Sequence, residues 1–177
     1  MVTATGRRIW VRAVGEAEFA DGKPVALVGA FEDITERRAR GDELRLFEAS
    51  IARINDAIVI TKADVLDGSG PQIVFVNPAF EKMTGFCEED ALGQTPRMLQ
   101  GQGTDRKELA RIKNALRQGE TVRAELLNYT KDRVPYWIEI DISPIKSAQD
   151  EITHLVAVER DITERRAAQA ELAAARD

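Results

Sequence analysis

Residues 76–94 read VNPAFEKMTGFCEEDALGQ, and they carry the clearest helix boundaries in the chain. Asn77 is a favoured residue just before a helix, because its side chain can accept a hydrogen bond from a first-turn amide. Pro78 fits the first helical position, and Gly85 fits the left-handed position that ends a helix. The acids that follow Cys87 suit the positive end of another helix. The stretch therefore predicts two short helices in succession.

Strand patterns lie on both sides of these helices. AIVIT from Ala57 and QIVFV from Gln72 precede them, with the turn-rich loop DVLDGSGP at 64–71 in between. A longer helix follows, which we expect Thr104 to cap and Gly119 to end. Three more strands are predicted at 121–131, 134–145 and 151–162. This order predicts an α+β domain with a five-stranded antiparallel sheet and short helices on one face.

Alternation along the late strands predicts which side chains face the helices and a cavity beneath them. The inward-facing residues are Val122, Ala124, Leu126 and Asn128 in one strand and Tyr136, Ile138, Ile140 and Ile142 in the next. Asn128 is the polar exception, and its amide needs a partner, either a ligand or a loop carbonyl. Trp137 points the other way, which predicts a covered or partner-facing outer surface.

A sequence repeat divides the chain. FEDITERRA at 31–39 recurs as ERDITERRA at 159–167, and each copy follows a hairpin whose first strand carries a tryptophan, Trp10 or Trp137. The repeat predicts that residues 1–34 are the C-terminal hairpin of a preceding, incomplete domain and that residues 57–163 form a complete one. Asp21 and Gly22 mark the turn of the first hairpin.

The segment 35–56 between the two units has a helical pattern, and a second helix is predicted from 164 to 177. Leu44, Phe47, Ile51, Ile54 and Ile58 follow the 3, 4 spacing of a coiled-coil seam. The seam covers only about two heptads. A helix–helix dimer and a contact within the chain therefore both stay open.

Composition and residue counts argue against several classes of protein. The net charge is −5, from 25 basic and 30 acidic residues that alternate along the chain, which argues against nucleic-acid binding. Cys87 and His154 are the only cysteine and histidine, so we expect no intrachain disulfide and no metal site. No nucleophile–base pair or phosphate loop is visible, so no catalytic residue is predicted. The absence of a long apolar run predicts a cytoplasmic fragment without a membrane segment.

On these residues the chain resembles a PAS domain. The matching pieces are residues 76–94, the hairpin LLNYTKDRVPYW at 126–137 and the terminal DIT, and together they span 57–163. Within that family, GQTPRMLQGQGTD at 93–105 and ELLNYTKD at 125–132 resemble the flavin-binding LOV branch. In that branch a cysteine of the first segment forms a photoadduct with the flavin.

The resemblance implies a set of flavin-contacting positions. Arg97 and Gln100 match the branch, and the arginine usually reaches the flavin phosphate. Lys113 stands in place of a second phosphate-contacting arginine, without the bidentate fork. Asn128 matches an amide that contacts the flavin ring.

Other positions depart from the branch. Pro96 stands at the photoactive cysteine, with Thr95 before it, and Ile138 replaces a second ring-contacting asparagine. Glu159 replaces the signalling glutamine of the last strand, and we expect it to face inward and pair with Arg97 or Lys113. FMN or FAD binding therefore stays open beside an empty cavity, and no photoadduct is expected.

The DIT motif stands at the strand-to-helix junction in both repeats, as Asp33 with Thr35 and Asp161 with Thr163. These residues either cap the following helix or couple the sheet to it, and the resemblance places signal exit here. It implies a sensory and dimerisation module of a bacterial-type signalling protein, with a histidine kinase or diguanylate cyclase output domain in cis. A homodimer through the linker seam and Trp137 is expected. The alternatives are a flavin-based redox or light sensor without photoadduct chemistry and a ligand-free interaction domain.

Overall fold

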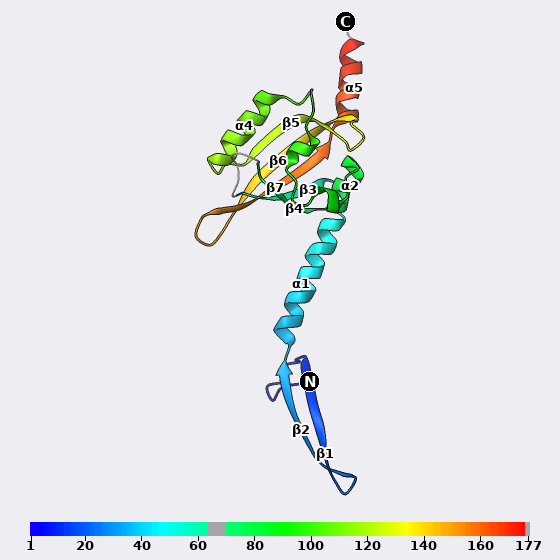
Figure 1. Ribbon diagram of the computed structural model, residues 1–177, viewed down its shortest axis with the longest axis vertical. Coiled ribbons are helices and arrows are strands. Elements are labelled where there is room, and N and C mark those ends of the chain that lie inside the picture. Colours follow the sequence, from blue (N-terminus) through cyan, green and yellow to red (C-terminus); the bar gives the residue numbers. More distant parts are fainter. Residues whose placement is uncertain (64–69, 176–177) are drawn as a thin grey trace. The chain divides into compact units, whose positions relative to one another are not determined.

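The computed structural model describes residues 1–63 and 70–175, and the chain divides into two compact units, Met1–Ser50 and Ile51–Asp177. The first unit holds β1 (Val11–Ala20), β2 (Lys23–Asp33) and most of α1 (Thr35–Ala52) (Figure 1). Most of the loop predicted at 64–71, and the last two residues of the exit helix, lie outside the described residues.

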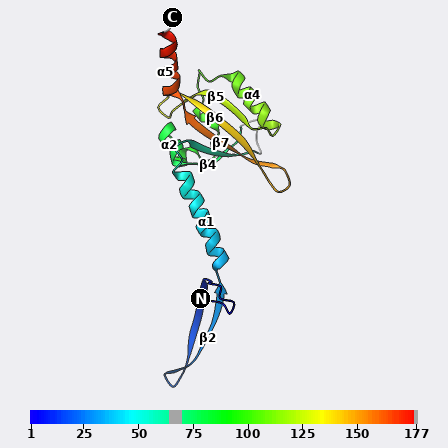
Figure 2. The ribbon, with the colours of Figure 1, turned by 180° about the vertical axis from the view of Figure 1, so that it is seen from behind.

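The second unit contains one antiparallel sheet and its covering helices. Its strands are β3 (Ala57–Lys62), β4 (Ile73–Val76), β5 (Val122–Tyr129), β6 (Pro135–Lys146) and β7 (Ile152–Asp161). Its helices are α2 (Pro78–Thr84), α3 (Glu88–Ala91), η1 (Pro96–Leu99), α4 (Arg106–Arg117) and α5 (Thr163–Ala174). The strand order is β4-β3-β7-β6-β5, so the predicted α+β class with a five-stranded antiparallel sheet is confirmed. The last strand in the sequence, β7, is the middle strand of the sheet, and α5 continues directly from it (Figure 2).

The core lies between the sheet and the helices. In this core α2 packs on β3, α3 on β4 and α4 on β5. Every residue that the alternation placed on the inner face of β5 and β6 is buried. The 3.6-residue period of α4 buries Ile112 and Leu116 against the same cluster. Of the helices in the described ranges, none is both long enough and apolar enough to cross a membrane.

Asn77 fixes the start of α2 as predicted. Its Oδ1 accepts hydrogen bonds from Phe80 N at 3.1 Å and from Ile58 N at 2.9 Å, and its Nδ2 donates to Asp56 O at 3.0 Å. One buried amide thus joins α2, β3 and the end of the linker. Gly85 ends the helix in the left-handed conformation, with φ of 75°.

The start of α4 differs from the prediction. Its cap is Asp105, whose Oδ1 accepts from Lys107 N at 2.8 Å and from Glu108 N at 3.3 Å. Thr104 is instead buried, and its hydroxyl donates to Leu127 O at 2.7 Å. Both residue types can cap a helix, and the hydroxyl is used to tie the connector to β5.

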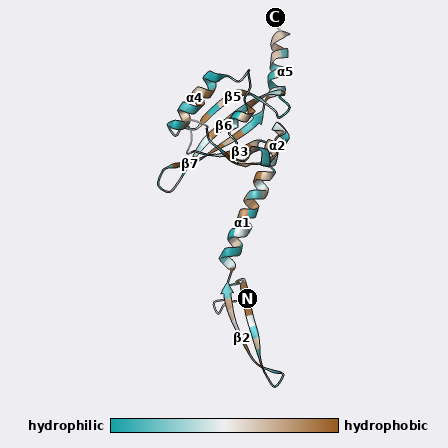
Figure 3. Ribbon diagram, in the orientation of Figure 1, coloured by the Kyte–Doolittle hydropathy of each residue, from teal (hydrophilic) through white to brown (hydrophobic). Residues whose placement is uncertain are grey.

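The first unit is an antiparallel hairpin followed by a helix. Asp21 and Gly22 adopt left-handed φ angles of 51° and 72°, which is the predicted two-residue turn. Hydrophobic positions recur along both strands (Figure 3). The large ones that are exposed are Val14, Phe19, Val25, Leu27, Val28 and Phe31.

The linker helix is shorter than predicted. It ends at Ala52, so Ile54 lies beyond it, and Ile58 belongs to β3, where it is buried. The sequence pattern fitted Ile58 both to the helical spacing and to the strand AIVIT, and the structure keeps only the strand. The seam on this helix is therefore limited to Leu44, Phe47 and Ile51.

Candidate functional site

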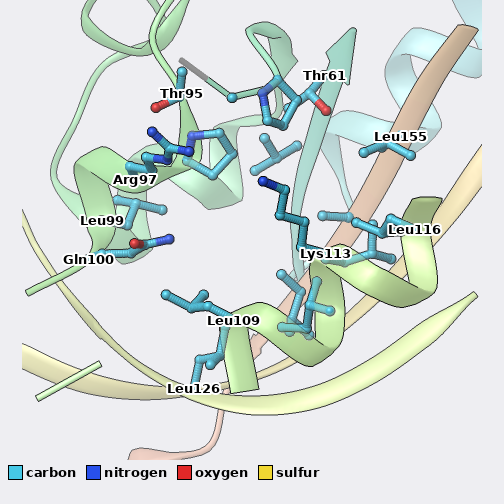
Figure 4. Close-up of a pocket in the computed structure, with 18 of the residues that line it drawn as sticks. Thr61, Thr95, Arg97, Leu99, Gln100, Leu109, Lys113, Leu116, Leu126 and Leu155 are labelled. Atoms are coloured by element: carbon cyan, nitrogen blue, oxygen red, sulfur yellow. The ribbon is translucent and has the colours of Figure 1, made fainter. Parts of the chain in front are cut away.

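A cavity of about 450 Å³ lies between the inner face of the sheet and the helices η1 and α4. Most of its wall is apolar and comes from both sides, with Leu99, Leu109 and Leu116 on the helices and Leu126, Ile140 and Leu155 on the strands (Figure 4). Its size falls in the range of small-molecule sites, roughly 300–1,000 Å³. A core that is simply filled with side chains does not describe this domain.

Three cationic side chains line the cavity. Arg97 comes from η1, and Arg106 and Lys113 come from α4. Figure 4 shows Arg97 and Gln100 on the η1 side facing Lys113 across the cavity. A Cβ added to Gly70 would lie 3.5 Å from Nε of Arg97, so the guanidinium packs on that glycine. These cations suit an anionic group such as a phosphate.

Polar groups also lie on the strands that line the cavity. Asn128 of β5 is 5% exposed and Glu159 of β7 is 3% exposed, and both line the cavity. Oε2 of Glu159 has no hydrogen-bond partner within the described residues, and neither has Oη of the neighbouring Tyr136. Burial raises the pKa of Glu159 to about 7. Near neutral pH this carboxyl therefore exchanges a proton inside a largely apolar wall.

The structure brings together five of the six positions assigned to a ligand. Arg97, Gln100, Lys113, Asn128 and Glu159 all line the cavity. Ile138 does not. It is fully buried in the core cluster instead. Burial is the only cause of the raised pKa of Glu159, so the expected pairing with Arg97 or Lys113 is absent.

Sequence reasoning missed one cation of the site. Arg106 was not singled out, although a basic residue in the first turn of a helix whose N-terminus borders a cavity is an unusual choice. Pro96 and Thr95 also line the cavity, so the position of the missing cysteine does face it.

The second part of the site is the end of β7. Asp161 Oδ1 accepts from Thr163 N at 2.8 Å, and the Thr163 hydroxyl accepts from the backbone amide of Trp137 at 2.9 Å. The guanidinium of Arg166 lies 3.8 Å from the centre of the Trp137 ring, a cation–π contact that covers the half-buried indole. We call Trp137, Asp161, Thr163 and Arg166 the junction cluster. It joins β6, β7 and α5 at one point.

Ion pairs extend this connection across the outer face of β5 and β6. Arg166 pairs with Glu125 at 2.7 Å, and Arg165 reaches Glu125 at 3.1 Å and Glu139 at 3.5 Å. Glu139 also accepts from Arg123, and these arginines hold the pKa of Glu139 below its usual value. The first turn of α5 is thus held by two acids of the sheet.

The first unit repeats the junction cluster with its own residues. Trp10 N donates to Thr35 Oγ1 at 2.8 Å, and Thr35 N donates to Asp33 Oδ1 at 2.9 Å. Arg38 lies 4.2 Å from the centre of the Trp10 ring. The sequence repeat is therefore a repeat of hydrogen bonds and of a ring contact.

Comparison with known proteins matches residues 55–164 to the PAS domain family. The blue-light-activated histidine kinase of Brucella anthropi is 34% identical over 121 residues, which are 68% of this chain and 24% of that protein. The bacterioopsin transcriptional activator of Halobacterium salinarum is 35% identical over 115 residues, 65% of this chain and 17% of that protein. The chain thus spans no more than about a quarter of the length of these relatives.

Solved structures agree on the fold. An RNA-binding light-oxygen-voltage receptor aligns over 95% of this chain and 43% of its own, with a TM-score of 0.65 and 24% identity. The LOV domain of the Erythrobacter litoralis blue-light activated histidine kinase aligns over 63% of this chain and 99% of its own, with a TM-score of 0.57 and 26% identity.

Glu159 should make the stability of the second unit depend on pH. The folded protein holds the proton of this carboxyl up to about pH 7, whereas the unfolded chain loses it near pH 4.5. The free energy of unfolding should therefore fall as the pH rises from about 4.5 to 7, by roughly 3 kcal/mol. Glu159→Gln should remove this fall. Urea unfolding at several pH values, in a Trp10→Phe background so that Trp137 reports the second unit alone, measures it.

The matched control is Glu120→Gln, since Glu120 is exposed. It should keep the pH dependence of the parent. A Glu159→Gln protein whose stability changes with pH as the parent's does would show that another group carries the effect.

Proposed function

The chain belongs to the PAS domain family, and on that basis we propose that it is the sensory and dimerisation module of a signal-transduction protein. One observation supports this proposal above the others. Glu159, an unpaired carboxyl that lines the cavity, lies on the central strand β7 and only two residues before Asp161 of the junction cluster. A change in the cavity would therefore act on the strand that continues into α5.

The proposed relay needs an element with two arrangements. Protonation of Glu159, or a hydrogen bond to it from a ligand, would change the charge buried next to Ala57 and Ile140, its neighbours on β3 and β6. The bonds of the junction cluster and the ion pairs of Arg165 and Arg166 set the direction in which α5 leaves the sheet. These contacts are exposed or half-exposed, so each is weak enough to exchange.

The output domain would be joined in cis beyond α5. Two of the similar proteins are a histidine kinase and a transcriptional activator by name. For this chain we propose a histidine kinase or a diguanylate cyclase, with the PAS module regulatory and not itself an enzyme. We propose a cytoplasmic location for the fragment, and neither nucleic acid nor membrane as its partner.

The first unit fits the same scheme. We propose that Met1–Ile34 is the C-terminal hairpin of a preceding PAS domain, residues 35–56 the linker, 57–163 the complete PAS domain and 164–177 the start of the exit helix. The repeated junction cluster supports this division.

A flavin is the second candidate, and the cavity favours it over a ligand-free interaction domain. Arg97 and Lys113 would hold its phosphate, and Gln100 and Asn128 would meet the polar edge of its ring. Protonated Glu159 could donate a hydrogen bond to a ring acceptor, which would satisfy its free oxygen. A bound flavin supplies light absorption and redox chemistry. Pro96 places no sulfur against it.

The junction cluster should control the exchange of its own amides. Thr163→Val removes the acceptor of the Trp137 amide, so hydrogen exchange should quicken at Trp137 and in the first turn of α5, while β3 and β5 stay protected.

In a fusion to a histidine kinase core, Asp161→Ala should make kinase output independent of what the cavity holds. Amide exchange measured by NMR tests the Thr163→Val variant, and autophosphorylation of the fusion tests the Asp161→Ala variant.

Thr153→Val, at the exposed far end of β7, is the matched control and should change neither. Normal regulation of the Asp161→Ala fusion would leave the junction cluster as a simple helix cap.

The side chain at position 96 should decide whether a flavin photoadduct can form. The protein mixed with FMN should show no light-induced loss of the visible flavin band, because no sulfur faces the cavity at this position. Pro96→Cys supplies a thiol there and should produce a bleached adduct under the same lamp. Absorption spectra before and after blue light measure both. Bleaching of the parent protein would contradict the expected absence of a photoadduct. No flavin uptake by either protein would contradict the proposal that the cavity binds a flavin.

The exposed seam of α1 should drive dimer formation. Leu44 and Phe47 are 59% and 60% exposed, one helical turn apart, and we propose that they pack against a second copy, with Ile51 and Trp137 near the interface. Phe47→Glu should shift the dimer to monomer in analytical ultracentrifugation. Leu46→Glu, on the same helix but off the seam, should leave the dimer intact. A monomeric parent protein would refute the proposal.

A further inference from the structure

The surroundings of Glu159 favour a neutral carboxyl. Its neighbours across the sheet are Ala57 on β3 and Ile140 on β6, and neither side chain offers a charge or a hydrogen bond. On the inner face of β5 and β6 the buried polar groups are the amide of Asn128 and the phenol of Tyr136. Burial and the charge of Glu159 raise the pKa of that phenol, so it too is uncharged. These groups give the charged form of Glu159 no support.

The cations of the cavity do not change this. Arg97, Arg106 and Lys113 line the same cavity, but none of them lowers the pKa of Glu159, which burial alone raises to about 7. Glu159 is also the only acid among the described residues that line the cavity. A positively charged ligand would meet three like charges, whereas an anionic group such as a phosphate would be held by them. The charge of a ligand thus belongs with the cations, and an uncharged group meets Glu159.

The neutral carboxyl also determines what that uncharged group can be. A protonated carboxyl presents one hydrogen-bond donor beside one acceptor, as the amide of a glutamine does. Oε2 of Glu159 has no partner within the described residues, and a buried polar atom without a partner costs free energy. A ring carbonyl beside a ring N–H would satisfy both oxygens of the acid. It would do so without leaving a buried negative charge that lacks a cation.

We propose that Glu159 binds the ligand of this cavity as a neutral acid, at the edge of a phosphorylated heterocycle, and that binding takes up a proton whenever the carboxyl is ionised beforehand. The acid donates its proton to a ring acceptor and accepts from the adjacent ring N–H. Arg97, Arg106 and Lys113 hold the phosphate, and the apolar wall packs on the ring. A flavin mononucleotide and a purine mononucleotide share this chemistry. The inference rests on the proposed function of the cavity as the sensory site.

The proton makes affinity depend on pH with a definite sign. Below about pH 7 the free protein already carries the proton, so affinity should change little. Above this pH the carboxylate has to regain a proton from solution before it can donate to the ligand. Affinity should therefore fall roughly tenfold for each pH unit above 7. The domain would then respond to its ligand only while the pH stays near or below neutral.

The test is calorimetric titration of the whole chain with FMN, and separately with GMP, at several pH values between about 7 and 8.5. In this range the phosphate of either probe is already ionised, because its second pKa lies near 6. Repeating each titration in buffers of different ionisation enthalpy gives the number of protons exchanged. We expect an uptake of roughly one proton per bound ligand near pH 8, together with the loss of affinity as the pH rises.

Glu159→Gln separates the proton from the contact. Its carboxamide keeps a donor beside an acceptor at every pH, so this variant should bind without proton uptake and with an affinity that does not change with pH. Near pH 8 it should bind about tenfold more tightly than the parent protein. Glu159→Met removes both polar atoms and should weaken binding at every pH. Glu120→Gln, at an exposed site, is the matched control and should keep the pH dependence of the parent.

Each other outcome overturns a distinct claim. Equal pH dependence in the parent and in Glu159→Gln, proton release on binding, or unchanged affinity in Glu159→Met refutes the neutral acid and leaves ligand binding by the cavity intact. Proton-linked binding of GMP without any binding of FMN keeps the inference and refutes the flavin candidate. No binding of either probe by any of these proteins refutes the inference and a phosphorylated heterocycle as the ligand, while the kinase fusion still tests the relay through the junction cluster.

Discussion

The hydrogen bond from the Trp137 amide to the Thr163 hydroxyl is the constraint that ties the exit helix α5 to the sheet. It forms where β7 stops and α5 starts, and it uses an amide of the neighbouring strand β6. Asp161 orients the threonine by accepting from its amide, so the helix can begin in only one direction from the sheet. Because β7 is the middle strand, α5 begins next to a strand that pairs with β3 on one side and with β6 on the other.

The cavity is the place where the domain departs from the rules of a stable core. A void of this size forgoes contacts that filled cores make, and an unpaired carboxyl inside it costs desolvation energy at neutral pH. Most of the other buried polar side chains of the second unit form hydrogen bonds. Asn77 makes hydrogen bonds with both atoms of its amide, and Thr104 uses its hydroxyl twice. Within the described residues, the buried polar atoms without a partner belong to Glu159 of β7 and Tyr136 of the neighbouring strand β6. Sites that break local rules in this way are usually functional.

Local chemistry made much of the fold predictable. Strict alternation along β5 and β6 predicted which face is buried. Asn77, Pro78 and Gly85 predicted where α2 begins and ends. Both predictions were possible because each signal acts within a few residues. The errors arose where two local readings were equally good. Thr104 and Asp105 are adjacent capping residues, and Ile58 fitted a helical period although β3 buries it. The protonation state of Glu159 was beyond such reasoning, because it depends on where segments 46 and 62 residues earlier in the chain place Lys113 and Arg97.

Comparison of the two copies of the junction cluster shows which of its contacts are shared and which charges differ. The tryptophan, aspartate, threonine and second arginine recur with distances that differ by no more than 0.4 Å, so the geometry of helix exit does not depend on the charges around it. The residue that follows two positions after the tryptophan does change, from Glu139 to Arg12. Charge at that position lies on the outer face, where it meets whatever strand lies alongside. The hydrogen bonds at the start of each helix thus recur, while the outer-face charge beside them reverses and its cross-strand partner reverses with it, from Glu139 opposite Arg160 to Arg12 opposite Glu32.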